Sequence, residues 1–245
     1  MLLTVLVGNS STRLAWFDGR KALAARVVST PAFRRDPARR LPLAPRPDAA
    51  ALCSVVPAAT RPARAAIAAR FKLRPFLLTT AAITGLEFDY DRRQLGPDRV
   101  CVAAGARERF PGDVIVIDFG TAVTVNALSA EGRFLGGPIL PGPGLMLASL
   151  HAGTGRLPLV RPAETAVSIP TGTTSALRSG VFAAVVGGVK HAVATVESAT
   201  GRRFTVLATG GAADRFRKHL PVISACDPLL GARGLAAIWR LNRSR

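Results

Sequence analysis

The sequence predicts an α/β protein in which one structural unit occurs twice, because the same strand–turn–strand pattern appears in both halves. The first copy occupies residues 3–19 and the second occupies residues 114–132. In each copy an apolar run is followed by a glycine-centred polar turn, a second strand-like run, and an acidic residue with glycine. Laying the copies together pairs Leu6 with Asp118. The motif is short, so two unrelated hairpins are the alternative interpretation.

The remaining elements follow from apolar runs bounded by Gly and Pro, which predict strands, and from Ala-rich runs, which predict helices. In chain order we expect an irregular Pro- and Arg-rich connection at 34–50, a strand at 51–56, a helix at 60–71, a loop continuing as a helix at 95–110, a strand at 123–128, a helix at 173–199, a strand at 204–208 and a helix at 230–242. The boundary is expected near Pro111-Gly112, which gives domains of residues 1–112 and 113–245.

The composition allows a large apolar core. Of 245 residues, 49% are hydrophobic and the mean hydropathy is +0.27, which argues against disorder. Residues 1–5 are typical of a buried strand rather than a signal peptide, and the longest apolar stretch, around 180–189, is expected to be too short and glycine-broken to cross a bilayer. We therefore expect a soluble, cytoplasmic protein without a membrane partner. Its three cysteines lie far apart and are expected to be reduced, structural thiols.

The formal net charge of +18 raises the question of nucleic-acid binding. Only four of the 33 basic residues are lysines, and many arginines stand among Ala, Pro and Gly. No helix-turn-helix, zinc-finger spacing or aromatic-studded basic groove accompanies the charge. We interpret it as a solvated basic surface that attracts phosphorylated or acidic substrates, so a nucleic-acid partner is not expected.

Two strand ends carry residues suited to nucleotide phosphates. Glycine lets the backbone approach a phosphate, neighbouring N–H and hydroxyl groups donate to it, and a carboxylate just before the glycine can hold Mg²⁺. Asp118 with Gly120 and Thr121 meets this description in full, and residues 8–10 meet it in part. A lone Gly-Thr after a strand is more often a plain turn, but the paired occurrence favours phosphate binding.

Asp98 is a candidate general base for attack of a hydroxyl group on ATP. It precedes Arg99 at the start of a predicted helix. From the local sequence alone, a helix N-cap is the favoured interpretation of Asp98. The three isolated histidines, and Ser10 outside any nucleophile elbow, give hydrolase chemistry little support.

Several motifs occur in an order that resembles the type III pantothenate kinase family, which also contains the Bvg accessory factor. The resemblance covers essentially the whole chain, and its middle motifs are specific to this family. The matching stretches are Val7-Gly8-Asn9-Ser10 and residues 95–99, 116–124, 132–142, 153–158, 170–173, 178–180 and 209–211.

This resemblance implies the acetate/sugar kinase–Hsc70–actin fold, with two ribonuclease-H-like (actin-like ATPase) lobes, a central cleft and a homodimer. It implies ATP-dependent phosphorylation of pantothenate to 4′-phosphopantothenate, the first step of coenzyme A biosynthesis. The implied cofactors are Mg²⁺ and a monovalent cation, K⁺ or NH₄⁺.

The resemblance also implies roles for individual residues. These are Asp98 as the general base; Tyr90, Gly96, Arg99 and Thr173 as substrate-binding residues; Gly8, Asn9, Ser10, Gly120 and Thr121 as ATP- and phosphate-binding residues; and Asp118 as the metal ligand. Thr173 would reach the substrate of the partner subunit. Tyr90 departs from the family pattern, because its spacing to Gly96 is one residue short and the proline that usually follows it is absent.

Two further departures bear on activity. Leu6 stands where the family has an aspartate, and Asn126 stands where the family usually has an acidic residue near the monovalent cation. Loss of a carboxylate from a metal–phosphate site removes charge-assisted interactions worth roughly a few kcal/mol. We therefore predict weakened use of ATP·Mg²⁺ or a rearranged metal site. The alternative function is that of a catalytically impaired or non-catalytic paralogue with a ligand-binding or regulatory role, and another kinase of the same fold is a third interpretation.

Overall fold

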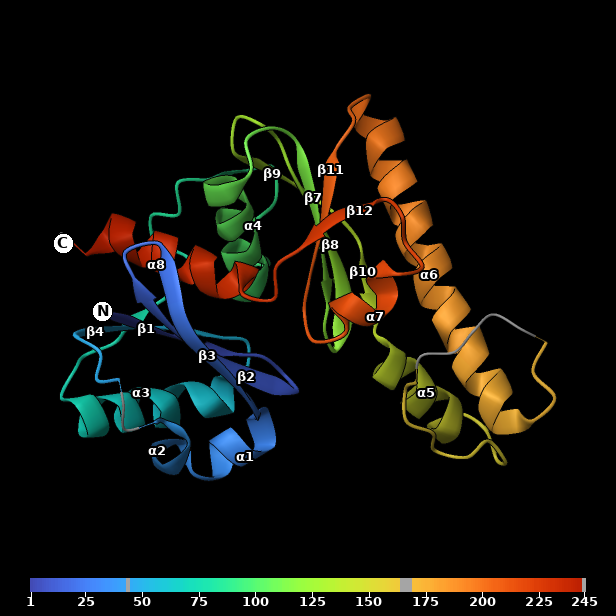
Figure 1. Ribbon diagram of the computed structural model, residues 1–245, viewed down its shortest axis with the longest axis horizontal. Helices are drawn as coiled ribbons and strands as arrows, with labels where there is room; N and C mark the ends of the chain where they lie inside the picture. Colours follow the sequence, from blue (N-terminus) through green and yellow to red (C-terminus); the bar gives the residue numbers. More distant parts are fainter. Residues whose placement is uncertain (43–44, 164–168, 244–245) are drawn as a thin grey trace. The chain divides into compact units, whose positions relative to one another are not determined.

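The computed structural model describes residues 1–42, 45–163 and 169–243 and divides the chain into two compact units (Figure 1). Unit 1 comprises Met1–Pro111, Leu128–Leu135 and Leu229–Arg245, and unit 2 comprises Gly112–Ala127 and Gly136–Pro228. The chain leaves unit 1 near the expected boundary but returns to it twice. The compact units are therefore interleaved, whereas the sequence-based division gave two consecutive stretches.

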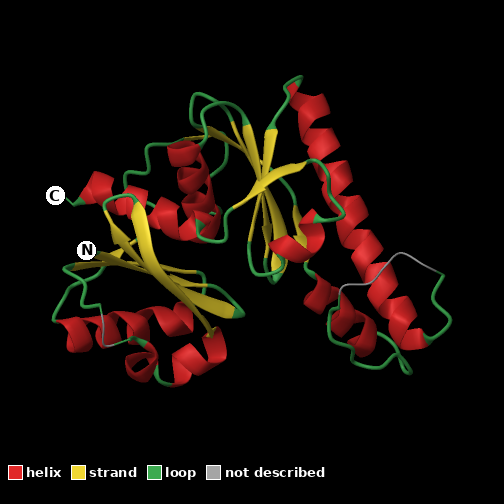
Figure 2. Ribbon diagram, viewed as in Figure 1, coloured by secondary structure: helices red, strands yellow, loops and turns green. Residues whose placement is uncertain are grey.

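Unit 1 is built on a five-stranded sheet with the strand order β3-β2-β1-β4-β5 (Figure 2). Its elements are β1 (Leu2–Val7), β2 (Ser11–Asp18), β3 (Lys21–Ser29), α1 (Thr30–Arg35), α2 (Pro37–Arg40), β4 (Ala49–Ser54), α3 (Pro57–Phe71), β5 (Phe76–Leu77), and the short parallel pair β6 (Glu87–Phe88) and β9 (Arg133–Gly136). β1 pairs antiparallel with β2 and parallel with β4. Leu3, Val5 and Leu52 of the sheet share one buried core with Ile67 of α3. The predicted first hairpin is therefore confirmed.

Helices α4 (Pro97–Arg109) and α8 (Leu230–Asn242) pack against each other in unit 1, and α8 contacts β1, β2 and β4 of the sheet (Figure 1). Two glycines allow the helices to approach closely. A Cβ on Gly234 would lie 1.7 Å from the carbonyl oxygen of Cys101, and a Cβ on Gly105 would lie 2.1 Å from that of Leu230. This close packing explains why the C-terminal helix belongs to unit 1 and not to the unit that precedes it in the chain.

The substitution Gly234→Ala is expected to lower the free energy of unfolding by about 1–3 kcal/mol, because α8 must move away from α4 to admit the methyl group. Urea unfolding followed by circular dichroism measures this loss. Gly187→Ala is the matched control, since nothing lies within 4 Å of a Cβ at that helical position. The control is expected to be neutral or stabilising by up to about 1 kcal/mol. Equal destabilisation by both substitutions would contradict the packing explanation.

Unit 2 repeats the arrangement of unit 1. Its elements are β7 (Val114–Phe119), β8 (Ala122–Leu128), β10 (Ile139–Pro141), α5 (Pro143–Ala152), α6 (Thr173–Thr200), β11 (Thr205–Thr209), α7 (Ala213–Arg217) and β12 (Ile223–Cys226). The strand order β8-β7-β11-β12 matches β2-β1-β4-β5, and β7 pairs in parallel with β11 as β1 does with β4. The repeated order confirms the predicted duplication of one α/β unit.

Helix α6 corrects the expectation about membranes. The apolar stretch at 180–189 is part of a 28-residue helix, whose mean hydropathy reaches 1.4 over 18 residues. Among the described residues it is the one helix long and apolar enough to cross a membrane, and 33% of the window is buried. The expectation that this stretch is too short is therefore wrong. Core helices of soluble proteins can be equally long and apolar, but most of their surface is then buried.

Candidate active site

Residues 8–10 form the turn between β1 and β2, at the carboxyl end of β1. Thr30 fixes this turn, because its hydroxyl donates to the Gly8 carbonyl (2.6 Å) and its N–H donates to the Ser10 carbonyl (2.9 Å). Asn9 and Ser10 are exposed. The turn is thus held in place and presents polar groups to solvent, as a phosphate-binding turn requires. Sequence analysis missed Thr30, whose only local signal is the proline that follows it at the start of α1.

Asp98 lies in the first turn of α4, whose N-cap is Gly96, so the N-cap interpretation of Asp98 is wrong. Its Oδ1 accepts the Arg99 N–H (2.9 Å) and lies over Gly96, where a Cβ would come within 2.5 Å of it. Burial raises the pKa of Asp98 above an aspartate's ordinary value, and the backbone N–H and charge of Arg99 oppose this rise only in part. A carboxylate with a raised pKa is the better proton acceptor, as a general base requires.

Arg99 is buried beside Asp98, with 4% of its surface exposed. Its guanidinium carbon lies 5.4 Å from the ring centroid of Phe134 and 5.7 Å from that of Tyr90, and the two rings meet edge-on at 6.1 Å. Burial lowers the pKa of Arg99, and Tyr90 and Asp98 raise it. Arginine nevertheless remains protonated in proteins, so the rings hold a fixed positive charge. The predicted residues of unit 1 around α4 thus lie together, joined by Phe134, which the sequence did not signal.

Leu6 fills the position of the missing aspartate with hydrocarbon. A Cβ on Gly231 of α8 would lie 3.1 Å from Leu6 Cδ2, so the leucine packs on that helix. Two other carboxylates follow β6 in the chain, and both are already paired. Asp89 accepts a hydrogen bond from an arginine of β9 (3.0 Å), and Asp91, whose pKa Arg93 lowers, accepts from Arg93 (3.2 Å). Both carboxylates are thus engaged in exposed ion pairs with arginines.

The second predicted group of residues lies in unit 2, at the carboxyl end of β7. Asp118 precedes a tight turn at Gly120, and two other glycines close on this region. Gly210 has φ 96°, and a Cβ there would lie 2.4 Å from Asp118 Oδ1. The Gly142 N–H donates to the Thr121 carbonyl (3.0 Å), where a Cβ would come within 2.3 Å. Glycine backbone therefore packs directly against the predicted phosphate turn, which explains the glycines after β10 and β11.

Thr209 ends β11 and is paired with Asp118 in parallel register. It is buried, with 1% exposed, and its hydroxyl has no hydrogen-bond partner among the described residues. An unpaired buried hydroxyl costs about 1–3 kcal/mol and usually has a bound water or ligand as its partner. Thr209 is thus a candidate donor to a phosphate oxygen beside Asp118. The sequence analysis did not identify Thr209 for this role.

Among the predicted site residues of unit 2, Asp118 is the one that offers a carboxylate to Mg²⁺. Mg²⁺ is usually held by one or two carboxylates together with substrate phosphates and water, so one carboxylate beside a phosphate-binding turn fits this ion. In the described part of the chain, no three His, Cys, Asp or Glu side chains gather to form a metal site by themselves. Asn126 is buried, and its amide donates to the Val116 carbonyl (3.1 Å) and the Thr124 hydroxyl (3.0 Å). Asn126 is therefore fixed by its NH₂ group, and only its amide oxygen has the chemistry of a cation ligand.

Thr173 is the exposed first residue of α6. It lines an apolar cavity of about 590 Å³ between α5 and α6, together with Met146, Leu150 and Gly180. Thr173 therefore belongs to the α5–α6 hairpin of unit 2.

The repeated strand order and the polar glycine turns at the strand ends define a class of fold, the duplicated ribonuclease-H-like (actin-like ATPase) fold. Solved structures support this fold over nearly the full length. A Campylobacter jejuni protein, provisionally described as a Baf family transcriptional activator, matches with a TM-score of 0.64 at 20% identity, covering 99% of this chain and 100% of that chain. A Sinorhizobium meliloti protein, provisionally described as a 2-dehydro-3-deoxygalactonokinase, matches with a TM-score of 0.61 at 16% identity, covering 98% of each.

Sequence comparison narrows the class to one family. The family model for type III pantothenate kinase matches residues 2–195. Proteins named type III pantothenate kinase match along the chain at 31% identity in Phenylobacterium zucineum (100% of both chains) and at 33% in Paramagnetospirillum magneticum (99% of this chain and 98% of the relative). The one from Dehalococcoides mccartyi strain CBDB1 is 30% identical over 99% of this chain and 96% of the relative. The chain belongs to the type III pantothenate kinase family.

Proposed function

We propose that this protein phosphorylates pantothenate with ATP, giving 4′-phosphopantothenate and ADP, the first step of coenzyme A biosynthesis. The observation that carries the proposal is the Asp98–Arg99 pair in a chain of this family. Burial raises the pKa of Asp98, and Arg99 beside it is a buried, fixed cation. The pair therefore combines a proton acceptor with a group that attracts an acidic substrate.

In the proposed reaction, Asp98 accepts the proton of the pantothenate hydroxyl as its oxygen attacks the γ-phosphorus of ATP. The new O–P bond forms while the bond from the γ-phosphorus to the β–γ bridging oxygen breaks, and ADP leaves with that electron pair. Arg99, held against the rings of Tyr90 and Phe134, faces a substrate that carries a carboxylate, to which a guanidinium donates well. Gly96 leaves room beside the base, because any side chain there would collide with Asp98.

Each unit has its own strand-end turn with groups suited to binding phosphate in this proposal. These are Gly8, Asn9 and Ser10 in unit 1, and, separately, Gly120, Thr121 and Thr209 in unit 2. Mg²⁺ held by Asp118 and phosphate oxygens would neutralise charge on the triphosphate. A monovalent cation, K⁺ or NH₄⁺, stays a prediction of the family resemblance, since Asn126 offers no carboxylate for it.

An ADP-release assay with ATP, Mg²⁺ and K⁺ tests the proposed function. ADP release is expected to rise with pantothenate and to stay at background with glucose, and mass spectrometry is expected to detect 4′-phosphopantothenate. Release that responds to glucose and not to pantothenate would assign the chain to another kinase activity of the same fold. Absence of turnover with every acceptor would favour a non-catalytic paralogue.

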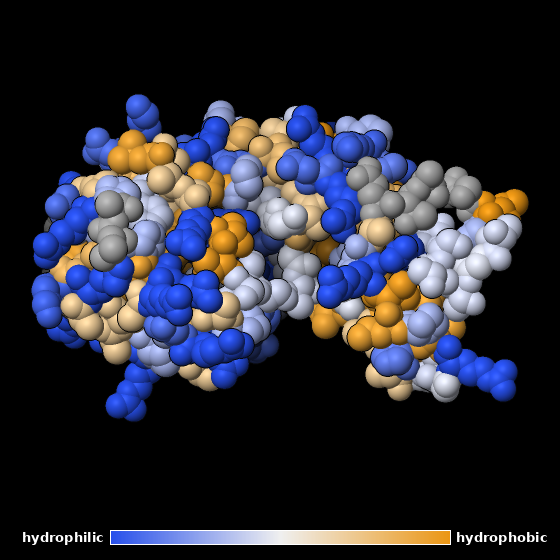
Figure 3. All heavy atoms as spheres, turned by 60° about the horizontal axis from the view of Figure 1, so that its bottom comes forward, coloured by the Kyte–Doolittle hydropathy of each residue, from blue (hydrophilic) through white to orange (hydrophobic). Residues whose placement is uncertain are grey.

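We also propose a homodimer formed through the α5–α6 hairpin of unit 2. Helix α6 is only partly covered, and apolar side chains are exposed on the face of unit 2 that carries α5 (Figure 3). Leu145 is 44% exposed and Leu150 37% exposed beside the apolar cavity. A second copy of this chain would cover these side chains and leave Thr173 next to the partner.

Light scattering after size exclusion tests this dimer. The wild-type chain is expected at twice the monomer mass, and Leu150→Arg is expected at the monomer mass, because it introduces a charge into the apolar face. Leu23→Arg is the matched control, since Leu23 is similarly exposed (47%) but lies on β3 of unit 1. A dimer that survives Leu150→Arg, or that is lost with Leu23→Arg, would contradict the assignment.

The cytoplasmic location stays a prediction, and the proposed dimer gives it a physical basis. If α6 packs against a second copy, its apolar face is covered by protein and not by lipid. The wild-type chain is then expected in the soluble fraction without detergent. Recovery only in the membrane fraction would instead assign α6 to the bilayer.

A further inference from the structure

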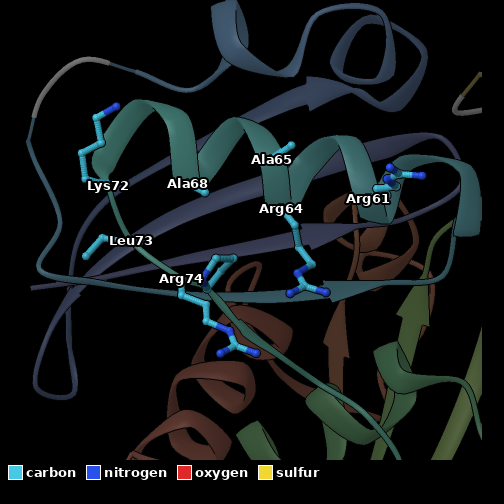
Figure 4. Close-up of a pocket in the computed structure, with 8 residues that line it drawn as sticks. Arg61, Arg64, Ala65, Ala68, Lys72, Leu73 and Arg74 are labelled. Atoms are coloured by element: carbon cyan, nitrogen blue, oxygen red, sulfur yellow. The ribbon is translucent and has the colours of Figure 1, made fainter.

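A second cavity, of about 640 Å³, lies wholly in unit 1 on the outer side of α3 and the segment that follows it (Figure 4). Four of its lining residues are cations: Arg61 and Arg64 on α3, Lys72 at the C-cap of α3, and Arg74 beyond it. The remaining lining residues are alanines, a leucine and a proline. Figure 4 shows Arg64 and Arg74 extending to the same side of the helix. We name this feature the α3 groove.

The four cations of the α3 groove are not neutralised by acidic side chains of the described residues. All four side chains are exposed. None of them forms a hydrogen bond or an ion pair with any described residue. No aspartate or glutamate occurs between residues 49 and 86. By contrast, Arg133, Arg202 and Arg240 each pair with an acidic side chain. The groove is therefore an uncompensated concentration of positive charge.

Lys72 ends α3 in the left-handed conformation, and its N–H donates to the Ala68 carbonyl. Its φ is 60°, and among the described residues it is the one non-glycine residue with a positive φ. Helices usually end in this conformation with glycine, because glycine has no Cβ to strain. Residues held in such strained conformations are concentrated at ligand sites and active sites. Lys72 thus carries a charge at the end of the helix, and no side chain of the described residues pairs with it.

We propose that the α3 groove binds a small ligand that carries several phosphoryl groups. The helical rise places the Cα atoms of Arg61 and Lys72 about 16 Å apart, farther than one phosphate can bridge. A ligand with two or more phosphoryl groups is long enough to contact more than one of these cations, and arginine pairs with phosphate oxygens in a bidentate manner. The volume of the groove is that of a small-molecule site. The groove shares no residue with the proposed active site, so this inference does not rest on the proposed function.

The lining favours a small polyphosphorylated ligand over a nucleic acid. Proteins that bind single strands stack the bases on aromatic side chains, and no aromatic residue lines the α3 groove. The four cations that line the groove come from one helix and the residues that follow it, whereas a duplex needs an extended basic surface. Alanine side chains form a flat floor that lets a phosphate chain lie along the helix.

Lysine acetylation tests the proposal directly, because the chain has only four lysines. The wild-type protein is treated with an acetylating ester with and without sodium tripolyphosphate, and each lysine is followed by mass spectrometry. At ten times the dissociation constant, tripolyphosphate is expected to slow acetylation of Lys72 about tenfold. Acetylation of Lys21, which is exposed on β3, is expected to stay unchanged. This readout is local, so tripolyphosphate bound at the strand-end turns does not affect it.

Two double variants complete the test. Arg64→Ala with Arg74→Ala is expected to weaken the protection of Lys72 about tenfold. Arg26→Ala with Arg34→Ala removes the same charge from exposed positions outside the groove and is expected to preserve the protection. Equal slowing at Lys72 and Lys21, or equal loss in both double variants, would overturn the proposal in favour of a net-charge effect. Protection by a DNA duplex but not by tripolyphosphate would overturn it in favour of nucleic-acid binding.

Discussion

Asp98→Asn is expected to lower kcat for pantothenate phosphorylation by about 10²–10⁴-fold, the usual contribution of a general base. The amide keeps the size of the carboxylate but cannot accept the substrate proton at neutral pH. The Mg²⁺ and pantothenate concentrations that give half of the maximal residual rate are expected to change little. The reason is that Arg99 keeps its place between Tyr90 and Phe134. Steady-state ADP release measures both quantities. Undiminished turnover would remove Asp98 from the role of base.

The same variant is expected to unfold at an equal or higher temperature than the wild type. Burial raises the pKa of Asp98 in the folded state, so ionisation of this group disfavours folding. The stability linked to its protonated form is full below the pKa of an unfolded aspartate and is lost as the pH rises through the folded pKa. At neutral pH the wild type therefore bears the cost of a buried charge, which asparagine avoids. A large fall in thermal stability would mean that Asp98 serves mainly to stabilise α4.

Catalysis by Asp98 also predicts the pH dependence of the rate. The wild-type kcat/KM is expected to rise with pH as Asp98 loses its proton, with a midpoint above the ordinary pKa of an aspartate. In Asp98→Asn this ascending limb is expected to disappear from the residual rate. A limb that persists unchanged would assign the titration to another group.

Leu6→Asp is expected to raise kcat/KM for ATP·Mg²⁺ by about tenfold to a hundredfold, since a carboxylate at a metal–phosphate site supplies charge-assisted interactions. Leu6 lies next to Gly231 in the first turn of α8. That helix has no acidic residue in its first turn and no side-chain cap. An aspartate there would face the positive end of the helix dipole and remain ionised. A titration with Mg²⁺ at fixed ATP measures the gain.

Leu6→Asn is the matched control for this substitution, because it has the same size and polarity without the charge. Both variants lose the hydrocarbon contact with α8, at a cost of about 1–2 kcal/mol in the free energy of unfolding. Only the aspartate is expected to improve turnover and lower the Mg²⁺ requirement. If neither variant gains activity, the leucine does not limit the use of ATP·Mg²⁺, and the rearranged metal site becomes the better explanation.

The sequence by itself determined the features that depend on local pattern. Alternation and glycine turns predict the β1–β2 and β7–β8 hairpins, because side-chain period and turn chemistry are set within a few residues. Alignment of the two copies also showed that Leu6 occupies the position equivalent to that of Asp118. Strand β3 was missed, because most of its residues are exposed and give no apolar alternation.

Only the tertiary structure decided the features that join residues distant in the sequence. The Gly105–Gly234 contact brings α8 back to unit 1, and the Arg99–Phe134 contact brings an aromatic ring from β9 to the candidate base. Burial likewise decided the pKa of Asp98, since desolvation depends on everything that packs around the carboxylate. Local sequence could not provide these facts, because close packing and desolvation are properties of the folded chain.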